Sequence, residues 1–159
     1  MASWREIEAE APELAALARG FLEARKHKTL ATLRRDGSPR ISGIEAEIVE
    51  GDLLWGGMPG AMKSLDLRRD PRFALHSASV DPPDWAGDAK VGGRAEEIHD
   101  EERKRALVAA QGNAGGAPGP FDLFRADVEE LVVVHLNEKR TKLLIERWRQ
   151  GDGVKRFER

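Results

Sequence analysis

A lysine and a serine follow a tight glycine turn in the segment 58–64, which reads Met58-Pro-Gly-Ala-Met-Lys-Ser. Gly60 allows the backbone to turn sharply, and Lys63 and Ser64 then fall in the first turn of a predicted helix. The unpaired N–H groups and the dipole at the start of a helix favour an anion. This segment is therefore a candidate phosphate-binding corner.

The predicted helix must end near Asp70, because a proline at position 71 cannot continue it. An alternative interpretation is a capped surface helix with a solvated basic face, formed by the arginines at positions 68, 69 and 72. The segment by itself favours neither interpretation.

Other kinds of site have weaker support. The histidines at positions 27, 76, 99 and 135 show no paired spacing, so no metal site is predicted. The chain has no cysteine, which excludes disulfides and thiolate chemistry and is compatible with a reducing cytoplasm. No serine lies in a Gly-x-Ser-x-Gly context, and no protein side chain is assigned a catalytic role.

The composition is that of one folded domain spanning residues 1–159, with 40% hydrophobic and 34% charged residues. No leader peptide and no membrane-spanning stretch is evident, so we expect a soluble cytoplasmic protein without a membrane partner. Residues 138–159 carry eight basic and four acidic side chains, but aromatic residues make up only 6% of the chain. A nucleic-acid partner is therefore not expected, and a small anionic ligand fits better.

The elements that must position this corner are short strands and helices. We expect an N-terminal helix over about residues 3–25, further helices over 62–70 and 100–111, and a flexible Gly/Pro loop at about 112–120. Strands are predicted over 29–33, 40–49, 53–56, 73–79, 89–98, 130–136 and 141–148. In the second of these, Ile44, Ala46 and Ile48 share one face. This order favours a mainly β fold with peripheral helices, in which about six or seven antiparallel strands close a barrel.

Three segments resemble the pyridoxamine 5′-phosphate oxidase-like split-barrel superfamily, which includes FMN-binding oxidases and reductases that use the deazaflavin F420. They are Leu30-Ala-Thr-Leu-Arg-Arg-Asp-Gly-Ser-Pro39, the stretch 63–75 and Gly92-Gly-Arg-Ala-Glu96. The order and spacing of the three segments carry the resemblance, which extends over roughly residues 20–159.

The resemblance implies a split barrel of the FMN-binding type and a homodimer with a cofactor site at each side of the interface. Lys63 matches the phosphate-binding lysine of the family, with Ser64 and Met58 beside it. The cofactor ring would lie along Ile41, Ser42, Gly43 and Ile44. Trp148 and Arg159 match residues that reach the flavin of the partner subunit.

The chain also departs from the oxidase pattern. Ser42 stands where the oxidase has a phosphate-binding arginine, and Glu47 stands where it has a substrate-binding lysine. Phe157 replaces a histidine that meets the substrate, whereas Lys155 takes the place of an arginine there. A phosphorylated substrate facing Glu47 would be repelled. Oxidation of pyridoxamine phosphate itself is therefore not expected.

The resulting expectation is an oxidoreductase that transfers hydride between FMN or F420 and a small conjugated or heteroaromatic substrate. In such an enzyme the cofactor carries the chemistry and the protein supplies position and electrostatics. The alternative is a non-catalytic protein of the same fold that binds or stores a flavin, F420 or haem.

Overall fold

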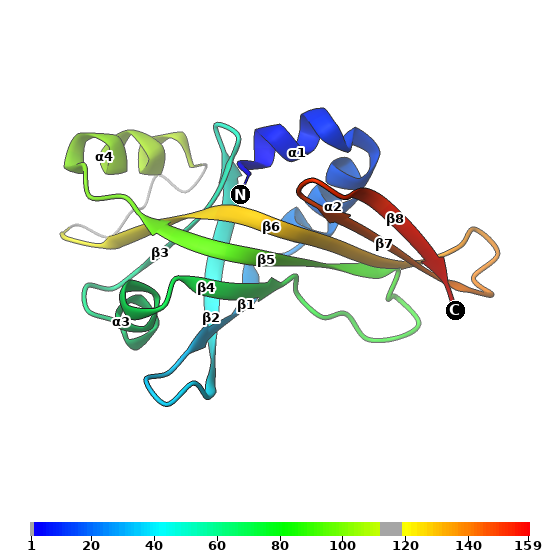
Figure 1. The fold of residues 1–159 in the computed structure, drawn as a ribbon, viewed down its shortest axis with the longest axis horizontal. Coiled ribbons are helices and arrows are strands. Elements are labelled where there is room, and N and C mark those ends of the chain that lie inside the picture. The colour runs from blue at the N-terminus through cyan, green and yellow to red at the C-terminus, as the bar shows by residue number, and fades with distance from the viewer. Residues whose placement is uncertain (1, 112–118) are drawn as a thin grey trace.

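A computed structural model describes residues 2–111 and 119–159, in which one antiparallel sheet of eight strands is surrounded by four helices (Figure 1). The strands are β1 (His27–Leu33), β2 (Pro39–Val49), β3 (Asp52–Gly57), β4 (Arg72–His76), β5 (Gly87–Glu97), β6 (Asp122–Leu136), β7 (Leu143–Arg149) and β8 (Gly153–Glu158). The helices are α1 (Trp4–Glu10), α2 (Pro12–Glu23), α3 (Met62–Arg69) and α4 (Glu101–Ala110).

Six of the strands close a barrel. Their order is β3-β2-β1-β4-β5-β6, and pairing between β3 and β6 completes the ring. β2 makes closure possible by changing partner, since Glu45 pairs with His27 of β1 whereas Ala46 pairs with Trp55 of β3. The prediction of a mainly β split barrel with peripheral helices is thus confirmed.

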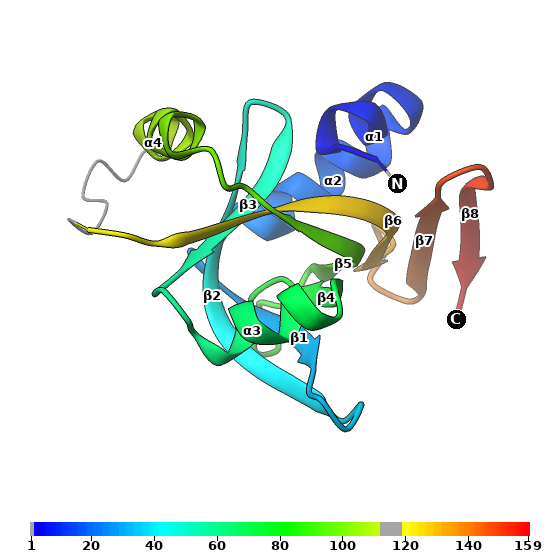
Figure 2. The same cartoon turned by 60° about the vertical axis from the view of Figure 1, so that its left-hand side comes forward.

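The sheet continues past the barrel as the hairpin of β7 and β8, attached to the edge of β6 (Figure 2). β8 was missed in the sequence because all six of its residues are exposed, which leaves no alternation of apolar and polar positions to detect. β6 runs from 122 to 136 and is longer than the predicted strand at 130–136.

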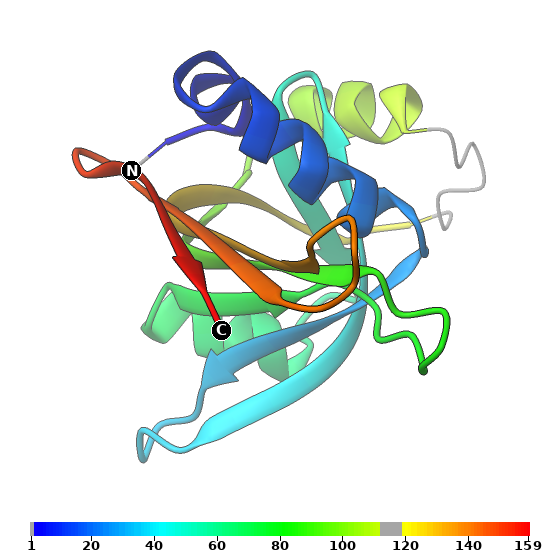
Figure 3. The same ribbon diagram turned by 90° about the vertical axis from the view of Figure 1, so that its right-hand side faces the viewer.

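The N-terminal helix is two helices instead of one. Ser3 forms a capping box with Glu6 at the start of α1, and the chain breaks at Ala11, where Pro12 opens α2. Both helices lie along one side of the sheet, and they bury Trp4 and other apolar residues against it (Figure 3). No helix in the described part of the chain is long and apolar enough to cross a membrane.

The barrel interior is filled by aromatic and branched side chains. Trp55 is buried between two phenylalanine rings, with centroid distances of 4.9 Å to Phe73 and 6.3 Å to Phe124. The expected bend at the glycine pair is a register shift between Gly92 and Gly93 in β5. A Cβ atom on Gly93 would lie 2.1 Å from the carbonyl oxygen of Asp127, so only glycine fits there. The Gly/Pro loop predicted at 112–120 lies mostly outside the described residues.

Candidate functional site

The turn before α3 has the expected geometry. Gly60 adopts a φ of 70°, and the Ala61 N–H donates to the Met58 carbonyl at 3.1 Å. Ala61 is the N-cap of α3 and supplies no side-chain acceptor to the first turn. The N–H groups at the start of this eight-residue helix therefore lack a side-chain cap.

Lys63 lies beside these N–H groups and is half-buried. Its ammonium group lies over the backbone of Gly57, where an added Cβ atom would be 3.1 Å from Nζ. Among the described residues, no carboxylate forms an ion pair with Lys63. A cation and an uncapped helix start thus occupy the same corner of the molecule.

Ser64 lies in the first turn of α3, as expected, but its side chain is fully buried. Its hydroxyl has no hydrogen-bond partner among the described residues. The hydroxyl and the Lys63 ammonium group both lie near Gly57, so phosphate binding by Ser64 stays a prediction.

Asp122, the first residue of β6, ties the corner to the barrel. Its carboxylate accepts hydrogen bonds from the Gly60 N–H at 3.2 Å and from Arg68 Nη2 at 2.8 Å. Burial by itself would raise the pKa of Asp122, but Arg68 and the Gly60 N–H outweigh it and lower the pKa below its usual value. The carboxylate is therefore charged at neutral pH.

The arginines of α3 are not a solvated basic face. Arg68 bridges Asp122 and Glu97, and Arg69 pairs with Asp66 at 3.0 Å. Arg72, just beyond the helix, pairs with Asp70 at 2.6 Å. The alternative interpretation is thus corrected for Arg68 and Arg69, whose ion pairs hold the helix, whereas Arg72 is solvated with 63% of its side chain exposed.

Asp66 anchors the other side of α3. Its side chain is 2% exposed and accepts from Arg40 Nε at 2.6 Å and from the Thr32 hydroxyl at 2.9 Å. Burial raises the pKa of Asp66, but hydrogen bonds from Arg40, Arg69 and Thr32 reverse this and lower the pKa overall. α3 is thus fixed to β1 and β2 through one buried carboxylate.

The four residues expected to line a cofactor ring do not share one face of β2. Ile41 is 74% exposed, and Gly43 is exposed on the same outer face. Ser42 is half-buried and Ile44 is buried in the core, because successive residues of a strand point to opposite sides. The expectation is corrected for Ile44, whose side chain is in the core, while a cofactor contact of Ile41, Ser42 and Gly43 stays a prediction.

Exposed apolar side chains gather on the elements of this corner. Met58 is 80% exposed, and Met62 and Leu65 of α3 are 55% and 44% exposed. Large apolar side chains at such exposure are available to a flat ligand or to a partner surface.

Glu47 lies beyond the point where β2 changes partner, opposite Leu54 of β3. It is half-buried and near Lys28, whose Nζ donates to the Ala46 carbonyl at 2.7 Å. Burial lowers the pKa of Lys28, while the charges of Glu47 and two other glutamates raise it by less. Glu47 therefore contributes to the electrostatic surroundings of Lys28.

Trp148 is fully buried, and its Nε1 donates to Glu10 Oε2 at 3.0 Å. The ring packs beneath the N-terminal helices and offers no surface to a second subunit. The expectation that Trp148 reaches a partner's cofactor is replaced by a core role.

The remaining tail residues are exposed on β8 and just after it. Phe157 is 40% exposed with Arg147 over its ring at 5.9 Å, and Lys155 pairs with Asp152 at 3.4 Å. Arg159 is exposed at the end of the chain. By the shorter path through the closed barrel, three strands (β3, β6 and β7) lie between β2 and β8. Figure 1 shows α3 and the C-terminal end of the chain at opposite ends of the molecule, so the tail and the α3 corner do not meet within one chain.

Sequence reasoning missed Arg40, Asp66 and Asp122. Arg40 and Asp66 are 26 positions apart, and Arg68 and Asp122 are 54 positions apart, so no local spacing indicates either pair. The one available signal was that acidic residues occupy positions of α3 and β6 where the pattern of the element predicts a buried side chain. A buried carboxylate needs a hydrogen-bond or ion-pair partner.

Two open grooves lie elsewhere, and none of the predicted cofactor residues lines either of them. One, of about 550 Å³, lies between Lys26 and the loop at 78–84, and the other, of about 630 Å³, runs from Arg72 to Gln150 past the glycine pair of β5. Within the described residues, no group of three potential metal ligands is found.

Comparison with known proteins identifies the fold. The sequence model of the pyridoxamine 5′-phosphate oxidase family matches residues 14–135. No curated protein matches the sequence.

Several solved structures are similar to this one. A heme binding protein from Mycobacterium smegmatis has a TM-score of 0.65 at 16% identity, covering 92% of this chain and 88% of its own. PhzG from Burkholderia lata 383, in complex with tetrahydrophenazine-1-carboxylic acid, has a TM-score of 0.63 at 16% identity, covering 98% and 92%. A pyridoxamine 5′-phosphate oxidase-related FMN binding protein from Nostoc punctiforme PCC 73102 has a TM-score of 0.61 at 15% identity, covering 100% and 97%.

Proposed function

Because the chain belongs to the pyridoxamine 5′-phosphate oxidase family, we propose that it is an oxidoreductase holding the phosphate of an FMN-type cofactor at the start of α3. The observation that carries this proposal is Lys63, a half-buried cation without a carboxylate partner among the described residues, beside an uncapped helix start. A phosphate bound there would satisfy both the ammonium group and the free N–H groups.

The residues of the corner fit such a cofactor. The first-turn N–H groups and Lys63 would hold the phosphate, and the exposed side chains of Met58, Met62 and Ile41 would provide apolar contact for a ring. When bound, FMN or F420 supplies the hydride chemistry. The chain's own part is to fix the phosphate end and to exclude water with these apolar groups.

FMN and F420 are equally compatible with the corner, since each presents a phosphate group to Lys63. The substrate is proposed to be a small conjugated or heteroaromatic molecule. Pyridoxamine phosphate itself is not proposed as the substrate. Ser42 and Glu47 stand where the oxidase has a basic arginine and a basic lysine, and neither of them is basic.

A homodimer is part of the proposal. The face of β6, β7 and β8 that points away from α1 and α2 carries Val134, Ile145 and Phe157 side by side across three strands. Val134 and Ile145 are half-buried and Phe157 is 40% exposed, which leaves an apolar row for a second copy to cover. Such a contact would bring the tail of one chain toward the corner of another.

The proposal is tested by titrating the purified protein with FMN, riboflavin and F420 while following fluorescence and the visible spectrum. Preference for FMN over riboflavin, or binding of F420, supports the phosphate corner. Turnover is then measured as reduction of the bound cofactor by a nicotinamide donor and its reoxidation by quinones or unsaturated ketones. Failure to bind either cofactor would remove the catalytic proposal and keep only the fold.

A non-catalytic binding protein is the second proposal. It is favoured by the substitutions at Ser42, Glu47 and Phe157 and by the likeness to the heme binding protein of M. smegmatis. A cofactor that binds tightly but is neither reduced nor reoxidised by any donor or acceptor supports this second function. Haem addition followed by absorbance distinguishes a haem protein from a flavin carrier.

A further inference from the structure

Asp122 is placed to control the shape of the corner without touching a ligand. It lies at the first position of β6, and its side chain is 11% exposed. One carboxylate oxygen accepts from the Gly60 N–H at 3.2 Å, and the other accepts from Arg68 Nη2 at 2.8 Å. A single carboxylate thus joins the turn before α3 to the last turn of the same helix.

These contacts fix the position of the first turn of α3. Gly60 belongs to the turn that leads into α3, and Arg68 lies on the helix two turns after its start. Two groups of the 60–68 segment therefore converge on one buried charge of the barrel.

We infer that Asp122 is the positioning residue of the phosphate corner, which aligns the first-turn N–H groups and Lys63 on one anion. This inference rests on the proposed function, since it concerns the same corner. On this inference, the preference for a phosphorylated ligand depends on a residue that does not itself contact the ligand.

Asp122 is itself negative, and this sign argues for a positioning role. A carboxylate that faced a phosphate would repel it. Here both carboxylate oxygens are turned to Gly60 and Arg68, and Arg68 also pairs with Glu97. Arg68 is thus shared by two carboxylates and does not cancel both charges, and the role of Asp122 is to hold the turn.

Asp66 provides a matched control. It is also a buried aspartate and belongs to α3 itself, with Arg40 at 2.6 Å and Arg69 at 3.0 Å. However, none of the hydrogen bonds of Asp66 within the described residues involves the turn at 58–61. Substituting either aspartate removes a buried carboxylate that fixes α3 to the barrel, but only Asp122 contacts the turn.

The experiment compares FMN with riboflavin, which lacks the phosphate, in four proteins: the full-length native chain, Asp122→Asn, Asp66→Asn and Lys63→Ala. The readout is the ratio of the two dissociation constants, measured at a temperature where each variant is folded. We expect Asp122→Asn to reduce the FMN preference at least tenfold while riboflavin binding stays within about twofold. Asp66→Asn should lower the melting temperature but leave the ratio unchanged.

The results distinguish failure of the positioning role of Asp122 from failure of the proposed phosphate corner. If Lys63→Ala abolishes the FMN preference while Asp122→Asn retains it, the corner stands and the role of Asp122 is overturned. If both aspartate variants lower the ratio equally, Asp122 has only a structural role and the inference also fails. If the native protein shows no preference for FMN over riboflavin, the proposed corner fails and the inference with it.

Arg68→Lys serves as a milder variant in case Asp122→Asn does not fold. It keeps the charge but loses the geometry with which Arg68 holds Asp122 and Glu97 together. A partial loss of the FMN preference, with riboflavin binding unchanged, supports the positioning role, and an unchanged ratio counts against it.

Discussion

Arg40 Nε donates to the buried carboxylate of Asp66 at 2.6 Å and so joins β2 to α3. The contact brings the strand that carries Ile41 next to the helix that carries Lys63. This ion pair therefore fixes α3 as a whole against the barrel, whereas the turn before α3 is held by Asp122.

Removal of the Asp66 charge should destabilise the fold. Asp66→Asn leaves Arg40 and Arg69 without their shared carboxylate, and breaking a buried pair of this kind costs about 3 kcal/mol of unfolding free energy. The control is Asp70→Asn, because the partner of Asp70, Arg72, is 63% exposed, so that solvent screens the pair and the expected cost is much smaller. Urea unfolding measures both, and equal costs would contradict the buried role of Asp66.

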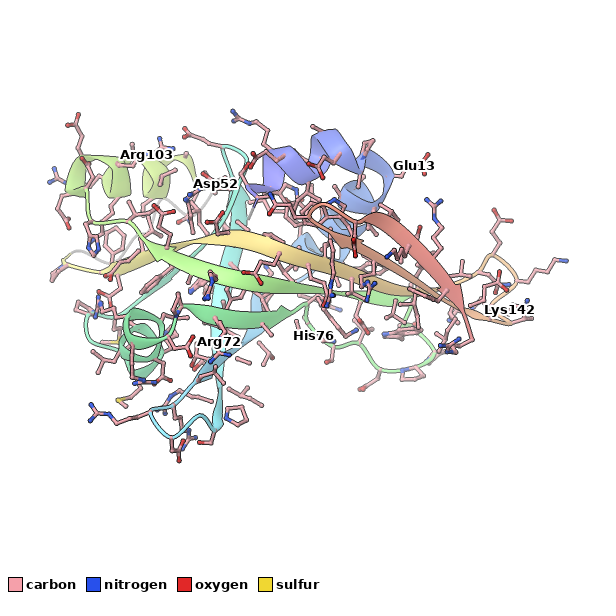
Figure 4. All side chains as sticks on the ribbon, in the orientation of Figure 1. Glu13, Asp52, Arg72, His76, Arg103 and Lys142 are labelled. Atoms are coloured by element: carbon pink, nitrogen blue, oxygen red, sulfur yellow. The ribbon has the colours of Figure 1, made fainter. Side chains whose placement is uncertain are left out.

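Lys63→Ala should weaken the binding of a phosphorylated cofactor. A charge-assisted contact contributes about 1.5–3 kcal/mol, which corresponds to a loss in affinity of roughly 10- to 150-fold. Lys142→Ala is a suitable control, because Lys142 lies at the opposite end of the sheet from α3 (Figure 4) and pairs with Glu158 at 2.8 Å. Fluorescence titration with FMN and F420 gives the result, and unchanged affinity would remove Lys63 from the site.

Trp148→Ala should act on stability rather than on the binding of cofactor by a partner. The ring is fully buried, and truncating such a side chain costs about 3–5 kcal/mol. Phe157→Ala, which removes a ring that is 40% exposed, should cost less than about 1 kcal/mol in the isolated chain. Chemical denaturation at low protein concentration tests the pair, and a stable Trp148→Ala variant with weakened cofactor binding would restore the interface role.

Two glycines should respond to alanine with opposite signs. At Gly93 an added Cβ would lie 2.1 Å from the Asp127 carbonyl oxygen, so the strands must separate at a cost of about 1–3 kcal/mol. At Gly20, within α2, nothing lies within 4 Å, and alanine should stabilise the helix by up to about 1 kcal/mol. Thermal unfolding of both variants measures these changes in stability. A Gly93→Ala variant as stable as the native protein would disprove the close approach of β5 and β6.

Acid should destabilise the protein through its buried aspartates. The pKa values of Asp66 and Asp122 are lowered in the folded state from an ordinary value of 3.8. The unfolded chain therefore binds more protons as the pH falls through 3.8, and the stabilisation present above that pH is lost progressively below it. Unfolding free energy measured from pH 6 down to about pH 2 should fall less steeply in Asp66→Asn than in the native protein; identical slopes would exclude a contribution from Asp66.

Several features of the fold follow from local sequence. Gly37 has a φ of 84° in the hairpin that the Asp36-Gly37 dipeptide predicts. Ser3 caps α1 through the spacing to Glu6, and the glycine pair in β5 marks the register shift. These signals are local because each depends on the backbone preferences of residues a few positions apart.

The sequence alone determined the barrel, the glycine turn and the uncapped start of α3, since apolar alternation and turn residues specify them over short distances. Only the tertiary structure decided that Arg68 meets Asp122, that Trp148 is buried against Glu10, and that Arg40 meets Asp66. These three contacts join residues that are 54, 138 and 26 positions apart in the sequence. Long-range pairing depends on how the strands close the barrel, and no local pattern of residue types encodes which buried charges will meet.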